Sequence, residues 1–101
     1  MEGGDMCTKV RFMIQGQELG AQELEIEAAV HQGKVCISFK CLTFGHQAIA
    51  GQLRQMLHEP NDLSIAQKDD VHTMNTRHSD VESLINFLRR MGYKCRELTA
   101  H

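Results

Sequence analysis

The residues best suited to acid–base chemistry are two histidines and an arginine in the second half of the chain, His72, Arg77 and His78. Two histidines with an arginine suffice for metal-independent RNA cleavage, because one imidazole can act as the base and the other as the acid. This set is therefore a candidate catalytic site of the ribonuclease type. The alternative, which we favour, is a polar connection that precedes a capped helix.

The four cysteines, Cys7, Cys36, Cys41 and Cys95, do not form a metal-binding pattern. They include no C-x-x-C pair of the kind that structural zinc sites use. The chain also contains no H-E-x-x-H motif, no phosphate-binding glycine loop and no G-x-S-x-G serine motif. We therefore expect reduced thiols, no metal and no cofactor, and we lean towards a protein that is not an enzyme.

Charged residues at alternate positions predict a polar surface that could bind a partner. Side chains at alternate positions of a strand share a face, and the expected strands place cations near a row of glutamates. The candidate binding residues are Lys9, Arg11, Glu23, Glu25, Glu27 and Lys40. A basic partner could bind the glutamate row. The alternative is a solvated face whose opposite charges neutralise one another.

These residues depend for their positions on a β-hairpin predicted over residues 24–41. With the turn at Gln32 and Gly33, positions whose numbers sum to 65 face one another. The apolar pairs on one face are then Leu24–Cys41, Ile26–Phe39, Ala28–Ile37 and Val30–Val35. One face of the hairpin is consequently apolar and has to be covered by the rest of the chain.

The remaining segments supply further strands and two helices. Alternation predicts strands over 7–14 and 93–98. Residues 61–76 favour a second hairpin with its turn at 68–70, and a loop is the alternative. An apolar stripe of Ile49, Leu53, Met56 and Leu57 predicts a helix over 46–58, with Thr43 as N-cap and Pro60 after its end. Gly51, in its middle, is expected to lie close to the sheet.

A second helix is predicted from a capping box in which Ser79 is the N-cap and Glu82 reaches back to it. Its buried stripe is expected to contain Val81, Leu84, Ile85, Leu88 and Met91, and Gly92 ends it. The predicted fold is a two-layer α+β domain, order βββα(ββ)αβ, with both helices on one face of an antiparallel sheet. Residues 1–6 are expected to form a flexible tail, and residues 7–101 a single domain.

The overall charge and hydropathy exclude several kinds of partner. A formal net charge of −2 argues against binding nucleic acid through its phosphates, and an aromatic content of 5% leaves little for base stacking. No apolar run approaches the roughly 20 residues that span a bilayer. The acidic N-terminal segment is unlike a signal peptide. We expect a cytoplasmic protein that binds neither membrane nor nucleic acid.

The run ELEIEAAVHQGKVCISFKC, followed by a predicted helix, resembles the C-terminal export-switch domain of flagellar-hook and type III secretion length-control proteins. The resemblance covers less than half of the chain and rests on the alternating pattern and the turn glycine. The chain departs from that family because it lacks the long ruler segment and adds a second helix. The resemblance implies, as one alternative, a component of a type III secretion or flagellar export-switch system.

Together these patterns predict a small protein-binding module: an adaptor, a chaperone-like partner, an inhibitor or another regulator. We expect it to bind a protein, or a second copy of itself, through an exposed strand edge and the acidic sheet face. The edge candidates are residues 7–13 and 93–98. The alternatives are the ribonuclease-like enzyme and a nucleic-acid-binding regulator, which would need a basic stripe that the sequence does not show.

Overall fold

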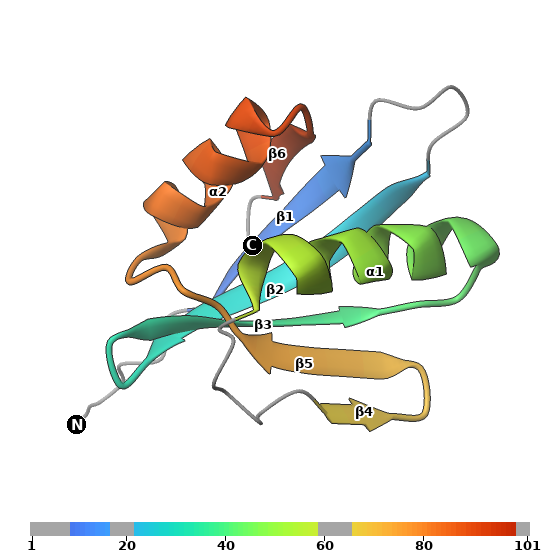
Figure 1. Cartoon of the computed structure of the whole chain (residues 1–101), viewed down its shortest axis with the longest axis horizontal. Coiled ribbons are helices and arrows are strands. Elements are labelled where there is room, and N and C mark those ends of the chain that lie inside the picture. The colour runs from blue at the N-terminus through green and yellow to red at the C-terminus, as the bar shows by residue number, and fades with distance from the viewer. Residues whose placement is uncertain (1–8, 17–21, 59–65, 99–101) are drawn as a thin grey trace.

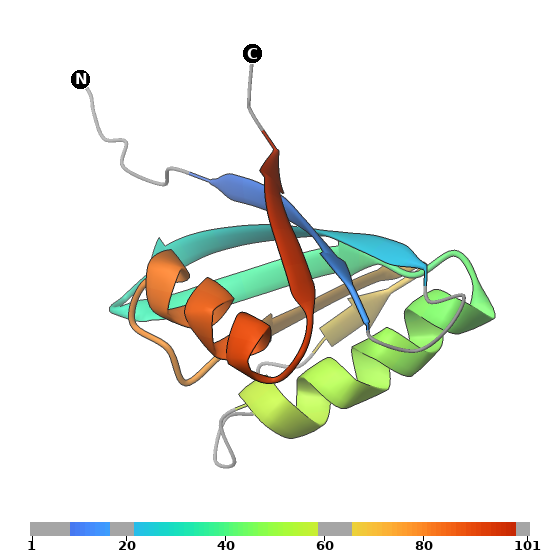
Figure 2. The same cartoon turned by 90° about the horizontal axis from the view of Figure 1, so that it is seen from above.

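The computed structural model describes residues 9–16, 22–58 and 66–98. Its elements are β1 (Val10–Gln15), β2 (Glu23–His31), β3 (Lys34–Lys40), α1 (Phe44–Leu57), β4 (Ala66–Lys68), β5 (Val71–Asn75), α2 (Val81–Arg90) and β6 (Lys94–Leu98). The strands form one antiparallel sheet in the order β4-β5-β3-β2-β1-β6 (Figure 1). Figure 2 shows both helices on one side of this sheet. The α+β class and the element order are confirmed.

The central hairpin has the predicted register. Ile26 faces Phe39 and Ala28 faces Ile37. Gln32 and Gly33 both have positive φ, 54° and 79°, as the two central residues of a type I′ hairpin turn require. Val30 departs from the prediction because it is 41% exposed. Its partner Val35 is buried, since the backbone of residues 76–78 crosses over it and bonds to it.

The position of β1 differs from the prediction. We expected residues 7–13 to form a sheet edge, but β6 lies beside β1 and pairs with it from Arg11–Leu98 to Gln15–Lys94. The edge prediction for this segment is therefore wrong, and only β6 and β4 form the edges of the described sheet. The alternation of a strand shows which face it buries, but it does not show which strand will lie next to it.

Helix α1 confirms the predicted N-cap and apolar stripe. The Thr43 hydroxyl accepts a hydrogen bond from the His46 N–H at 3.1 Å. Ile49, Leu53 and Leu57 are buried, and Met56 packs partly against the core. Pro60 lies outside the described residues. The start of α1 and the face that it turns to the sheet therefore follow from an N-cap and an apolar stripe that the sequence alone predicts.

The prediction that Gly51 lies against the sheet is wrong, because a Cβ placed there meets nothing within 4 Å. Gly51→Ala is therefore expected to raise the free energy of unfolding by about 0.5–1 kcal/mol, the difference in helix propensity. Gly33→Ala, at φ +79°, should lower it instead. Urea unfolding of both variants checks this, and a destabilised Gly51→Ala protein would show that the helix backbone is closely covered.

Helix α2 begins one residue later than the capping box predicts. Asp80, not Ser79, is the N-cap, and its carboxylate accepts a hydrogen bond from the Ser83 N–H at 2.8 Å. A carboxylate is the stronger acceptor for the helix N-terminus, so it takes the position. Leu84, Ile85 and Leu88 are buried as predicted. Met91, expected in that stripe, is 51% exposed because the helix has ended at Arg90.

The second hairpin is confirmed where the structure describes it. Strands β4 and β5 pair from Ala66–Thr73 to Lys68–Val71, and Asp69 has a φ of 56° at the turn between them. The predicted tail and His101 lie outside the described residues. Among the described helices, neither is long and apolar enough to cross a membrane.

Candidate functional site

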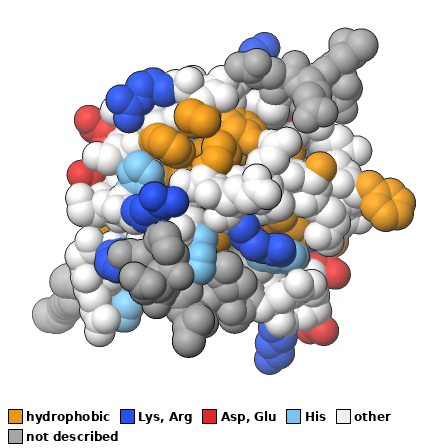
Figure 3. Space-filling model, viewed as in Figure 1, with side chains coloured by type: hydrophobic (Ala, Val, Ile, Leu, Met, Phe, Trp, Pro, Cys, Tyr) orange, Lys and Arg blue, Asp and Glu red, His pale blue; other side chains and the backbone are white. Residues whose placement is uncertain are grey.

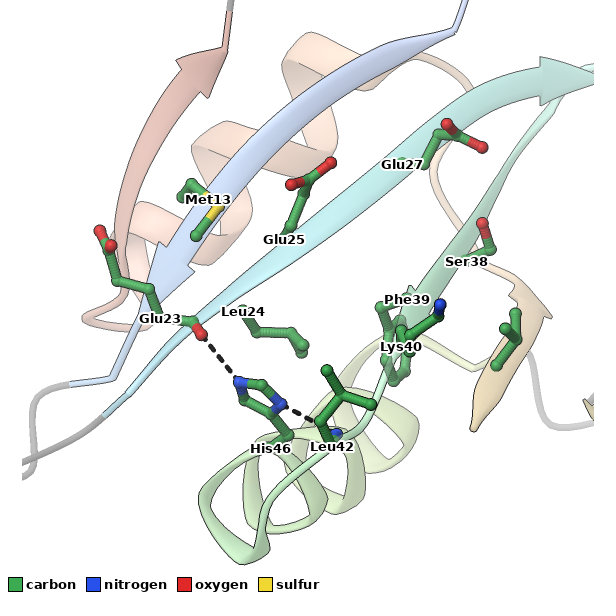
Figure 4. Close-up of a pocket in the computed structure, with 11 residues that line it drawn as sticks. Met13, Glu23, Leu24, Glu25, Glu27, Ser38, Phe39, Lys40, Leu42 and His46 are labelled. Atoms are coloured by element: carbon green, nitrogen blue, oxygen red, sulfur yellow. Dashed lines mark hydrogen bonds between the residues drawn. The ribbon is translucent and has the colours of Figure 1, made fainter. Parts of the chain in front are cut away.

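The face of the sheet that points away from the helices, which we call the open face, is uncovered in the described part of the chain (Figure 2). It contains a hollow of about 510 Å³, which we call the sheet hollow (Figure 4). Its lining residues are Met13, Glu23, Leu24, Glu25, Glu27, Ser38, Phe39, Lys40, Leu42, His46 and Val71. Four of the predicted binding residues, the three glutamates and Lys40, therefore line one concave surface.

A histidine at one end of the sheet hollow separates β2 from the chain that follows β3. The His46 Nδ1 lies 3.1 Å from the Leu42 N–H, and its Nε2 lies 3.0 Å from the Glu23 carbonyl oxygen (Figure 4). The pairing of β2 with β3 ends at Ile26–Phe39, so the predicted Leu24–Cys41 pair is not part of the described ladder. If the register continued, Leu42 would face Glu23. The imidazole thus occupies the place of a direct backbone bond: Nδ1 accepts from Leu42, and Nε2–H donates to Glu23.

This insertion separates β2 from the chain after β3 at one end of the hairpin. Residues of this separated end, Leu24, Phe39 and His46, line the hollow. Thr43, which caps α1, also donates a hydrogen bond from its hydroxyl to the Gln22 side-chain oxygen. The N-terminus of α1 is therefore joined to the start of β2 by two side chains. The sequence does not indicate this role for His46, because one of the ring's two partners, the Glu23 carbonyl, is distant in sequence.

The three glutamates of β2 are already paired with cations. Lys9 lies 3.5 Å from Glu27, and Arg11 lies 3.5 Å from Glu25. Arg96 of β6 lies 3.3 Å from Glu23. Each pair is exposed, so each contributes at most about 1 kcal/mol. The pairs form the mixed-charge face that the alternating pattern indicates. Arg96 was not among the predicted residues, because its place on this face depends on the pairing of β6 with β1.

Lys40 lies on the other side of the hollow and differs from the cations of β1 and β6. Within the described ranges it forms no ion pair, and the same is true of Lys68 on β4. Both side chains are exposed. The two sides of the open face thus differ: the β2–β1–β6 side holds opposite charges in pairs, and the β3–β5–β4 side holds Lys40 and Lys68, which form no ion pair with the described residues.

Apolar side chains are exposed at the rim of the hollow. Leu42 is 65% exposed and Val71 is 37% exposed, and both line the hollow. Phe44, two residues after Leu42, is 94% exposed but does not line the hollow. Large exposed apolar side chains that gather in one place are typical of a surface that binds another molecule. The sequence contains one indication of these exposed residues: Leu42 and Phe44 are apolar, but they belong neither to the alternating pattern of the hairpin nor to the apolar stripe of the helix.

His72 lies on the helix side of the sheet and is buried, with 4% of its surface exposed. Its Nδ1 lies 2.8 Å from the Arg54 guanidinium, and its ring stacks on Phe39 with centroids 5.4 Å apart. The buried Nε2 makes no hydrogen bond with the part of the chain that is described. Since an arginine only donates, Nδ1 accepts, and the imidazole is neutral in this arrangement.

His78 and Arg77 lie elsewhere. The ring of His78 packs against Phe87 of α2, while the Arg77 Nε donates to the His58 carbonyl at the end of α1. Residues 72 and 76 are separated by about 13 Å of strand, so the rings of His72 and His78 are not brought together. The ribonuclease-like site remains a prediction, and the structure gives its two imidazoles separate surroundings.

The environments of buried His72 and half-buried His78 predict a loss of stability in acid. Burial, and secondarily the Arg54 guanidinium, hold the pKa of His72 below its ordinary value of 6.5. Burial and Arg77 likewise lower the pKa of His78. As the pH falls through about 6.5, the unfolded chain takes up protons that the folded chain does not. The free energy of unfolding should therefore be highest above pH 6.5 and should decrease below it.

Urea unfolding of the wild-type protein and of His72→Gln at a series of pH values measures this effect. The His72→Gln protein is expected to lose less stability between about pH 7 and pH 5 than the wild type, whatever its stability at neutral pH. An identical pH dependence in both proteins would contradict the assignment of His72 as a neutral core residue.

Two of the described cysteines have thiols that ionise less readily than a free thiol. Burial raises the pKa of the Cys41 and Cys95 thiols, which makes their thiolates scarce at neutral pH. Cys95 faces Ile14 and the core, opposite to Lys94 and Arg96, as the alternation predicted. Among the described residues, no group of three or more His, Cys, Asp or Glu side chains could hold a metal ion.

The helix side of the molecule carries a second, smaller hollow of about 280 Å³, lined in part by Gln52, Met56, Met91 and Tyr93. The Tyr93 hydroxyl donates a hydrogen bond to the Gln52 side-chain oxygen. Figure 3 shows hydrophobic side chains gathered on this side of the protein. We use this helix-side hollow as the control surface when binding at the open face is tested.

Comparison with known proteins supplies no family for the chain. No protein-family model matches the sequence, and the searches of curated proteins and of solved structures found no significant match. The function therefore has to be argued from the surface that has just been described.

Proposed function

We propose that the chain is a non-enzymatic protein-binding module whose docking surface is the open face around the sheet hollow. The observation that carries the proposal is the combination of Leu42 and Val71, both exposed, with the concave surface that they line. Protein interfaces combine apolar and polar groups, and here the exposed apolar side chains lie at the rim of a hollow that is also lined by charged residues of β2 and β3. Burial of such side chains against a partner is favourable by roughly 25 cal/mol per Å².

Strand edges support docking less well than the open face. β6 is short, and Lys94, Arg96 and Glu97 give it charged side chains. The Arg89 guanidinium also donates to the Cys95 carbonyl of this strand at 3.2 Å. Charges and side-chain contacts on an edge strand discourage the addition of another strand. Docking through an edge, including pairing with a second copy of the chain, remains a secondary proposal.

The proposal also concerns how this protein acts on its partner. We favour an adaptor, chaperone-like partner or inhibitor that acts in the cytoplasm by occupying a surface of another protein. No feature of the open face favours the ribonuclease-like or export-switch alternatives. In particular, His72 is too deeply buried to touch a substrate without rearrangement of the helix side.

Affinity capture tests the proposal. The tagged full chain is incubated with lysate of its source cells, with and without ribonuclease, and the bound material is identified by mass spectrometry. We expect one protein in near-stoichiometric amount that survives ribonuclease and that is lost when Leu42 and Val71 are both replaced by glutamate. Recovery of the same protein by that variant, or recovery of RNA instead of protein, would overturn the proposal.

A further inference from the structure

We propose that the partner presents an extended segment in which acidic side chains flank an apolar one, and that this segment lies across β3, β5 and β4. The apolar side chain would contact Val71, and the carboxylates would pair with Lys40 and Lys68. This inference rests on the proposed function and names the chemistry of its partner.

The charge distribution of the open face selects an acidic partner. Every glutamate of β2 already has a cation within 3.5 Å. A basic partner would have to compete with Lys9, Arg11 and Arg96 for those carboxylates. Lys40 and Lys68 have no ion pair with any described residue, although Asp69 and Asp70 follow Lys68 in the turn. Unpaired charges at a rim favour partners of the opposite sign.

The strand register places these residues in one line. Val71 pairs with Lys68 on one side and with Lys40 on the other. Neighbouring strands are about 4.8 Å apart, so the two lysines flank Val71 at roughly 10 Å from each other. Alternate side chains of an extended peptide recur about every 6.8 Å, a spacing that flexible lysine side chains can match.

The shape of the face is consistent with a segment that crosses it. A further hollow of about 560 Å³, lined by Lys40, Lys68, Val71 and Thr73 together with the turn aspartates, adjoins the sheet hollow. The two hollows share Lys40 and Val71. We call these two adjoining hollows the trough, and exposed Leu42, which lines the sheet hollow, offers a second apolar contact.

A peptide fits this surface better than a nucleic acid does. Apart from His31 beside the hairpin turn, the described strand residues that point to the open face include no aromatic side chain on which a base could stack. The aliphatic side chain of Val71 lies between two lysines. A polypeptide can complement this arrangement with an apolar side chain between two carboxylates, whereas a nucleic acid has no aliphatic side chains.

The test uses the ¹⁵N-labelled full chain and three defined probes of similar length, followed by amide chemical shifts. The first is a capped peptide of the pattern Glu-Ser-Val-Ser-Glu, whose glutamates and central valine share one face when it is extended. The second has lysine in place of glutamate, and the third is a single-stranded oligouridylate. We expect the acidic peptide to shift the amides of Lys40, Leu42, Lys68 and Val71 and to bind at least about tenfold more tightly than the lysine peptide.

Charge-reversal variants complete the test. Lys40→Glu combined with Lys68→Glu should reverse the preference between the two peptides. Lys94→Glu is the matched control, because it makes the same change to an exposed lysine on β6 at the far edge, and it should leave the preference unchanged. If the lysine peptide bound the same amides as tightly, the acidic partner would be excluded while docking on the open face would stand.

Two other results would overturn the inference. One is failure of both peptides to shift open-face amides. This result would reject the acidic segment but not the proposed function, which is tested separately by protein capture from the lysate. The other is tighter binding by the oligouridylate at the same lysines, which would assign this trough to nucleic acid.

Discussion

Phe12→Ala is expected to lower the free energy of unfolding by about 3–5 kcal/mol, the usual cost of removing a fully buried phenylalanine ring. Phe12 has no exposed surface and lies on β1, a strand with a neighbour on each side. It pairs with Ile26 and contributes to the core beneath the helices. Because small domains have about 5–15 kcal/mol of stability in total, this one change should leave the protein marginally folded at room temperature.

Met13→Ala is the matched control, since the next residue along β1 points to the open face. Met13 is half-buried and lines the sheet hollow. Its truncation should cost less than about 1 kcal/mol, because no layer of the described chain covers it. Urea unfolding of both variants measures the difference. Equal destabilisation by the two changes would mean that both faces of the sheet are covered, and the open face would not exist.

Replacing both Leu42 and Val71 with glutamate is expected to weaken binding of the protein partner by at least about tenfold, or about 1.4 kcal/mol. The two changes remove the apolar contacts of the rim, and the carboxylate at position 71 lies between Lys40 and Lys68, where it competes with the carboxylates of an acidic partner. Both side chains are exposed in the free protein, so the folded state should survive. Calorimetric titration with the captured partner gives the affinity, and circular dichroism checks the fold.

Met91→Glu provides the control for this variant. Met91 is as exposed as the rim residues but lines the helix-side hollow. The affinity of the Met91→Glu protein should equal that of the wild type. A large loss with Met91→Glu, and none with the Leu42 and Val71 double variant, would transfer the docking surface to the helix side.

The sequence predicts those parts of the fold that depend on local patterns. The register of the central hairpin follows from alternation around Gln32 and Gly33, and the start of α1 follows from Thr43. The order of the strands does not follow, because β6 reaches β1 only after an intervening helix has packed. The N-cap of α2 was misplaced by one residue because Ser79 and Asp80 are both good caps.

The candidate site was predicted in its charges but not in its shape. The glutamates of β2 and the cations Lys9 and Arg11 are found together as expected. The hollow depends on His46, whose imidazole joins two backbone segments that are far apart in sequence. Its apolar rim depends on Leu42, which lies between a strand and a helix and belongs to neither pattern. Contacts of this kind appear only once the chain is folded.

The most direct test of the docking surface is the footprint of the captured partner on the ¹⁵N-labelled protein. We predict that partner binding will shift or broaden the amide signals of Met13, Ser38, Lys40, Leu42 and Val71, and leave those of Gln52, Gln55 and Met91 unchanged. The reverse pattern, with the helix-side signals perturbed and the open-face signals unchanged, would contradict the account.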